Sequence, residues 1–227
     1  MDSLTQPVDT RRRLWIPAVL TLLAVAVAAV AVTPYLTTTL GRLAAEGGGL
    51  ADAYVDQAPA VRAVFYVHIV TGGLALVLSP VQLWPAIRRR LPALHRWVGR
   101  VTLAAITVAG AAGLVLAPFN QAGTVGILGF GILAVLWPGA SWLGWAAARR
   151  QDLVGHREWM TRAFALTFAA VTLRLWTGVL MAVQVAAAGG DLDAETAFAR
   201  GYLLVPFLCW VPNLIVAELV IRRTRRA

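Results

Sequence analysis

The chain has 227 residues, of which 59% are hydrophobic and 14% are charged. A soluble domain of this size is usually about 45–50% apolar and about one quarter charged. The composition therefore excludes an ordinary soluble domain and, because the apolar residues form long blocks, indicates an integral membrane protein. The net charge of +9 does not indicate a nucleic-acid partner, because most of the 20 basic residues, which are all arginine, lie in short tracts beside the apolar blocks.

Six apolar stretches, each close to the ~20 residues that cross a bilayer core, predict an all-α polytopic bundle of six transmembrane helices. In chain order they cover about 14–36, 61–84, 98–118, 124–147, 162–188 and 201–221. The first stretch is longer than the ~7–15 apolar residues of a signal peptide, so we expect it to remain as an anchor. The alternative is a cleaved signal sequence, which the Ala-x-Ala patterns near Ala29 and Ala31 would allow. Residues 14–221 then form one transmembrane domain between basic tails at 1–13 and 222–227.

The arginines predict the orientation of the bundle. Sixteen of the 20 lie in the two tails and in the connections after the second and fourth helices, and the other four are Arg42, Arg62, Arg174 and Arg200. Connections rich in arginine face the cytoplasm. We therefore expect both termini to be cytoplasmic and the bilayer to be the principal partner of the chain.

The second predicted helix carries a polar or small stripe at steps of three and four residues: His68, Gly72, Ala75, Ser79 and Gln82. Ionisable groups inside a membrane are costly, so each is a functional candidate by default. The simplest arrangement turns this stripe toward a polar interior of the bundle. The alternative is that its side chains only hydrogen-bond one helix to another.

A second stripe follows the fifth predicted helix: Thr167, Ala170, Arg174, Thr177, Met181 and Gln184. At ~1.5 Å rise per residue, Arg174 falls near the midplane and requires a partner, a water-filled cavity or an anionic ligand. The sixth helix adds Asn213 and Glu218 to the predicted polar interior. Its Pro206 and Pro212 free backbone carbonyls for hydrogen bonds with other helices.

Two histidines precede the third and fifth predicted helices in similar surroundings, His95-Arg96-Trp97 and His156-Arg157-Glu158-Trp159. If they face each other at the cytoplasmic surface, Glu158 or Asp152 could complete a metal site with them. The alternative, which we favour, is that both histidines tether helix starts to lipid headgroups.

Several segments in order resemble a bacterial family of predicted multi-pass membrane proteins, domain of unknown function 2306. They are His68 with Thr71-Gly72-Gly73, Leu94-His95-Arg96-Trp97, His156-Arg157-x-Trp159-Met160-x-Arg162, Thr172-Leu173-Arg174, and Trp210-Val211-Pro212-Asn213 with Ala217-Glu218. The resemblance covers about residues 60–220 and implies a bacterial inner membrane. It supplies no reaction. The family's pattern includes seven of the polar residues: His68, His95, His156, Arg162, Arg174, Asn213 and Glu218.

Four functions remain open from the sequence. The favoured one is a redox-type bundle that binds haem b or quinone through His68 and Arg174, with Met181 as a second haem ligand at a similar depth. A second is a transporter of an anionic solute centred on Arg174. A third is a membrane enzyme with the inner metal site, although no HExxH or serine motif predicts catalytic residues. The last is an accessory protein, and a homo-oligomer is compatible with each of them.

Overall fold

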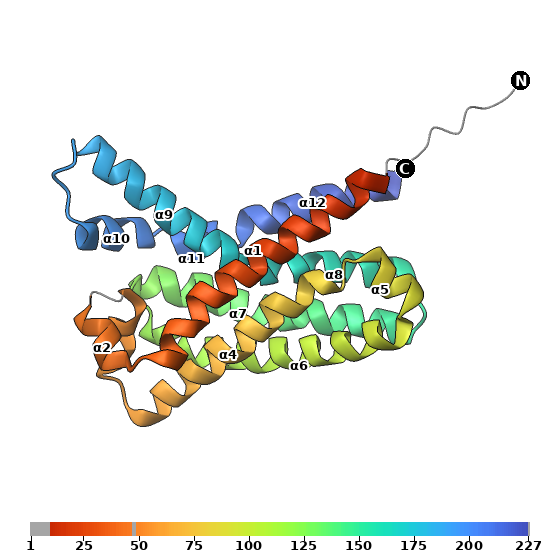
Figure 1. Ribbon diagram of the computed structural model, residues 1–227, viewed down its shortest axis with the longest axis horizontal. Coiled ribbons are helices and arrows are strands. Elements are labelled where there is room, and N and C mark those ends of the chain that lie inside the picture. The colour runs from red at the N-terminus through yellow and green to blue at the C-terminus, as the bar shows by residue number, and fades with distance from the viewer. Residues whose placement is uncertain (1–9, 47–48, 227) are drawn as a thin grey trace, which may run out of the picture.

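The computed structural model describes residues 10–46 and 49–226, and this part of the chain is helical with no strand (Figure 1). Four helices form the central bundle: α4 (Pro59–Val81), α6 (Pro92–Leu116), α7 (Gly123–Arg149) and α8 (Leu153–Thr167). Each packs on the next in chain order, and α8 returns to contact α4. Short connections make sequential helices antiparallel neighbours, so the chain order fixes this arrangement.

The prediction of six membrane-spanning helices is confirmed. The spans are 14–37, 59–81, 92–119, 123–149, 153–187 and 205–226, each long and apolar enough to cross a bilayer. The first belongs to α1 (Thr10–Thr37), which packs on α4 outside the central bundle and exposes apolar side chains such as Leu22 and Val30. Outward apolar side chains suit a bilayer as the surrounding solvent.

The two ends of the bundle differ in charge. One end holds the start of α1, α5 (Pro85–Arg90), the α7–α8 connection and the end of α12 (Val211–Arg226), and we call it the arginine-rich end (Figure 1). The opposite end carries α2 (Leu40–Ala45), the short turns Gly49–Ala51 and α3 (Asp52–Val55), and α10 (Ala194–Tyr202). The short turn Ala117–Phe119 extends α6 at that same end.

The fifth span is longer than predicted, because it begins at Leu153 rather than near 162. The Asp152 carboxylate caps its first turn by accepting a hydrogen bond from the Gly155 backbone N–H at 2.8 Å. Charged residues interrupt the apolar pattern in α8, so the sequence did not show that the membrane-spanning helix begins there. The span divides at Phe168 into α8 and α9 (Ala169–Ala187), and α9 leaves the central bundle to pair with α10 (Figure 1).

The sixth predicted helix, 201–221, is divided in the structure. Its residues belong to the end of α10, to α11 (Val205–Leu208) and to α12 (Val211–Arg226), which continues through most of the predicted tail 222–227. Pro206 and Pro212 occupy the second positions of α11 and α12, where a missing backbone N–H is tolerated. The carbonyl oxygen of Cys209, at the end of α11, accepts hydrogen bonds from Thr172 Oγ1 at 2.5 Å and Asn213 Nδ2 at 3.1 Å.

Candidate functional site

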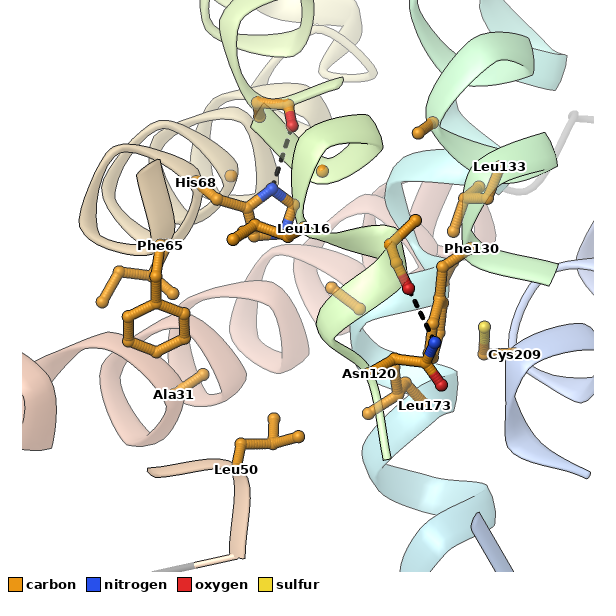
Figure 2. A pocket seen from close by; sticks show the side chains of 18 of the residues that line it. Ala31, Leu50, Phe65, His68, Leu116, Asn120, Phe130, Leu133, Leu173 and Cys209 are labelled. Atoms are coloured by element: carbon orange, nitrogen blue, oxygen red, sulfur yellow. Dashed lines mark hydrogen bonds between the residues drawn. The ribbon is translucent and has the colours of Figure 1, made fainter. Parts of the chain in front are cut away.

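A cavity of about 250 Å³ lies in the half of the bundle nearer α2 and α3. Side chains of α1, α3, α4, α6, α7, α8, α9 and α10 contribute to its wall. Cys209, just after α11, contributes as well (Figure 2). Most of the wall is apolar, including Phe65, Leu133 and Leu173. The polar groups on it that carry the argument below are His68, Arg174, Tyr54 and Tyr202. A largely apolar pocket with a few convergent polar groups is the usual form of a small-ligand site.

His68 is held in one orientation by α6. Its Nδ1 lies 2.9 Å from the Ala109 carbonyl oxygen, which can only accept, so Nδ1 carries the ring proton (Figure 2). Nε2 of the neutral ring is then an acceptor. The ring packs against Gly113, where an added Cβ would lie only 3.1 Å from Cε1 of the imidazole. Glycine at this position therefore gives the ring its place beside the cavity.

Arg174 brings a positive charge to the same cavity. Its Nη1 donates a hydrogen bond of 2.8 Å to the Ala170 carbonyl oxygen of its own helix. Its electrostatic neighbours are Tyr35 and Tyr202, and among the described residues no carboxylate lies within ion-pair distance of its guanidinium. Arg174 lies 13 residues from Ala187 and 21 residues from Leu153, the two ends of the longer span, and its depth near the midplane stays a prediction.

The tyrosines of this site were not predicted. Burial, and next the neighbouring Tyr35, raises the pKa of Tyr54 to about 12. Burial, and next Tyr54, raises the pKa of Tyr202 above its usual value. Both phenols therefore remain protonated donors beside the cavity. The sequence shows Tyr54 only as part of a long connection, and no periodic pattern relates a connection to the wall of a cavity.

Three other predicted residues lie elsewhere. Met181 is not among the residues that line the cavity, so His68 and Met181 do not form the predicted haem-ligand pair there. Ser79 donates a hydrogen bond of 2.7 Å to the Ala75 carbonyl oxygen of its own helix. When the Gln82 amide is turned toward His95, its nitrogen lies 2.5 Å from Nδ1 of the His95 ring. This contact links the end of α4 to the start of α6 at the arginine-rich end.

Asn213 and Glu218 connect helices. Asn213 Nδ2 lies 3.0 Å from Thr172 Oγ1 and 3.2 Å from the Ala165 carbonyl oxygen, so it joins α12 to both sides of the break at Phe168. Glu218 accepts two hydrogen bonds from Arg162, at 2.5 and 3.0 Å, and joins α12 to α8. Asn213 and Glu218 therefore hydrogen-bond one helix to another, which is the alternative considered above for the polar side chains.

The residues predicted as a metal site are only partly brought together. His95 and His156 come within electrostatic reach of each other at the arginine-rich end. The Glu158 carboxylate instead accepts a hydrogen bond of 2.5 Å from Arg225 Nε, so an arginine of α12 takes the oxygens that a metal would need. Among the described residues, no group of three or more His, Cys, Asp or Glu side chains is placed to hold a metal ion.

Comparison with known proteins gives a family and no activity. The family model described as "Predicted membrane protein (DUF2306)" matches residues 65–221. No curated protein and no solved structure matches the chain. The matched range contains His68, Arg174 and most of the cavity wall, and it leaves out α1 and the connection that contains Tyr54.

Proposed function

The chain belongs to the DUF2306 family of predicted membrane proteins, and we propose that it binds a small lipophilic ligand with a polar head group, of the quinone class. The observation that carries the proposal is that His68 and Arg174 line the same apolar cavity. A quinone has an apolar ring and carbonyl oxygens that accept hydrogen bonds. Guanidinium and phenol donors on an apolar wall match that pattern.

The polar groups suit both redox states of such a ligand. Arg174 and the tyrosine hydroxyls donate to quinone oxygens, and a guanidinium without a carboxylate partner stabilises negative charge that develops on them during reduction. Nε2 of His68 accepts a proton from a hydroquinone hydroxyl, because Nδ1–H is already committed to the Ala109 carbonyl. The site thus offers a proton acceptor and a fixed positive charge in one cavity.

The size of the cavity favours quinone over haem. A volume of about 250 Å³ is below the ~300–1,000 Å³ of typical small-molecule pockets, so it suits a single ring better than a macrocycle. Haem b also requires an axial ligand set, and His68 is the one histidine among the lining residues. An anionic solute recognised by Arg174 is the second candidate, because none of the carboxylates that the structure describes lies within ion-pair distance of its guanidinium.

Quinone binding is expected to depend on both polar residues. The purified protein in mild detergent is titrated with a short-tailed benzoquinone and with its hydroquinone, and the quenching of tryptophan fluorescence is followed, because Trp137 lines the cavity. Arg174→Gln should weaken binding of the quinone by roughly 10- to 100-fold, the effect of losing a hydrogen bond from a charged group. His68→Gln should weaken binding of the hydroquinone by roughly tenfold, because the neutral Nε2 accepts a hydrogen bond only from the hydroquinone hydroxyl. Arg62→Gln and His156→Gln are the matched controls.

The His156 control is closely matched because its Nδ1 also bonds a backbone carbonyl of a neighbouring helix, Gly144, at 2.8 Å. Equal affinity in all four variants would overturn the proposal. The same preparations are scanned for visible absorption before and after dithionite. A Soret band that disappears in His68→Gln would show that the ligand is haem and not quinone. Binding of an anion that depends on Arg174, without quinone binding, would establish the second candidate.

We further propose that the arginine-rich end faces the cytoplasm of a bacterial inner membrane, which the positive-inside rule supports. A fluorescent protein fused after Ala227 should then fluoresce, and alkaline phosphatase fused there should be inactive. The same two reporters inserted at Asp191, in the α9–α10 connection, should give the opposite result. Active alkaline phosphatase at the C-terminus would show that the arginine-rich end faces away from the cytoplasm.

A further inference from the structure

The cavity lies beside the point where α1 and α9 cross. The two helices pack together through Ala24 and Ala28 of α1 and Val171 of α9, which belong to one buried apolar cluster. Past this crossing the helices diverge toward the end of the bundle that carries α2 (Figure 1). There α1 packs on α4, where the rings of Tyr35 and Phe65 lie 5.1 Å apart, and α9 packs on α10. The two helices thus have different partners on this side of their crossing.

Both helices contribute to the cavity wall just past the crossing. Ala31 and Val32 come from α1, and Leu173 and Arg174 come from α9. We call these four residues the lateral wall. Figure 2 shows Ala31 and Leu173 on opposite sides of the cavity. All four are half-buried, and the cavity is partly open rather than enclosed. Because α1 and α9 belong to membrane-spanning segments, an opening between them leads into lipid.

Small residues leave space on the α1 side of the cavity. Gly72 of α4 lines the cavity, and a Cβ added there would meet no atom within 4 Å. At the next residue, Gly73, an added Cβ would lie 2.7 Å from Cγ2 of Val32, so glycine allows α1 to approach α4 closely. Contact with α4 therefore sets the position of α1, and the space beside Gly72 stays unfilled by protein atoms.

We propose that the ligand is a quinone with a long hydrocarbon tail, and that the tail leaves the cavity at the lateral wall, between α1 and α9, and lies in the bilayer. This inference rests on the proposed function, because it concerns the same ligand. The cavity of about 250 Å³ suits a single ring, so a long tail must lie outside it. A tail that leaves between two membrane-spanning helices remains in lipid.

The opposite side of the cavity is less suitable for a hydrocarbon tail. Its wall there includes Ala53 in the connection before α4, and Asn120 and Gln121, which fall between two membrane-spanning segments. The Asn120 side chain holds this turn, since Nδ2 donates to the Ala117 carbonyl oxygen at 2.6 Å and Oδ1 accepts from the Ala122 backbone N–H at 2.6 Å. A tail that left on this side would exchange lipid for polar groups and water, which is unfavourable.

The test separates the tail from the ring. Two ligands with the same benzoquinone head, one without a tail and one with a decyl tail, are titrated in mild detergent by the quenching of tryptophan fluorescence. Ala31→Phe places a large side chain at the lateral wall, and Ala53→Phe, the matched control, places one on the opposite side of the cavity. Each affinity is divided by that of the wild type for the same ligand, so that partition into micelles cancels.

We expect Ala31→Phe to weaken binding of the decyl quinone about tenfold more than binding of the tail-free quinone, because the added ring occupies the path of the tail. Ala53→Phe should affect the two ligands equally. Ala170→Phe obstructs the same path from α9, and it should repeat the result of Ala31→Phe. The test therefore does not depend on the folding of one variant.

Three outcomes would overturn the lateral exit while tail-free quinone binding upheld the proposed function. The first is a tail-dependent loss in Ala53→Phe alone, which would place the exit on the opposite side. The second is an equal effect on both ligands in all three variants. The third is a wild type that binds the tail-free quinone but not the decyl quinone. A wild type that bound neither ligand would instead overturn the proposed function, and this inference with it.

Discussion

Replacement of Gly129 by alanine is expected to destabilise the protein by about 1–3 kcal/mol, the usual cost of inserting atoms into a packed interface. Gly129 lies on α7 where α11 crosses it. A Cβ at this position would lie 2.6 Å from Pro206 Cβ and 2.8 Å from the Pro206 carbonyl oxygen. Pro206 is fully buried and its ring is rigid, so a flexible side chain cannot move aside. The neighbouring backbone must shift instead.

The control for this substitution is two residues away on the same helix. A Cβ added at Gly131 meets no atom within 4 Å, so Gly131→Ala should be neutral or stabilising by up to about 1 kcal/mol through helix propensity. Both variants are unfolded by denaturant in mixed micelles, and the free energies of unfolding are compared. If Gly129→Ala were as stable as Gly131→Ala, the close approach of α11 to α7 would be wrong.

Replacement of Glu218 by alanine is expected to destabilise the protein by about 2 kcal/mol. The substitution leaves Arg162 without its two hydrogen bonds, at 2.5 and 3.0 Å. Removing one member of a fully buried ion pair costs about 3–5 kcal/mol, and we expect less here because the side chains retain 19% and 35% of their exposed surface. The stacking of Arg162 over Trp159, at 4.6 Å, remains in the variant.

The chain contains an exposed ion pair for comparison, Arg42 with Glu46 in neighbouring turns at the other end. Glu46→Ala should lower the free energy of unfolding by at most about 0.5 kcal/mol, because that pair is solvated. The double variant Arg162→Leu with Glu218→Leu should recover part of the lost stability, since it leaves no unpaired charge. Equal effects of the Glu218 and Glu46 substitutions would show that the α8–α12 pair does not hold these helices together.

The membrane class and the number of spans were determined by the sequence itself. A bilayer requires that backbone groups be satisfied within each segment, so a stretch of ~20 apolar residues has almost one structural solution. The six predicted stretches are the six spans of the structure, although α6 and α8 begin earlier, where charged residues mask the helix. His68 and Arg174 were found as candidates for the same reason: polar groups are costly and rare inside a membrane.

The tertiary structure decided which of these candidates share a cavity. The sequence gives the face of each helix but not its neighbour, so it did not separate Met181, outside the cavity wall, from Arg174, which lines it. The same limit concealed Tyr54, which reaches the cavity from a connection, and Arg225, which takes Glu158 from the predicted metal site. Whether a segment lies in lipid depends on the composition of that segment alone. Which partner a side chain contacts depends on residues far apart in the chain, as Glu158 and Arg225 are.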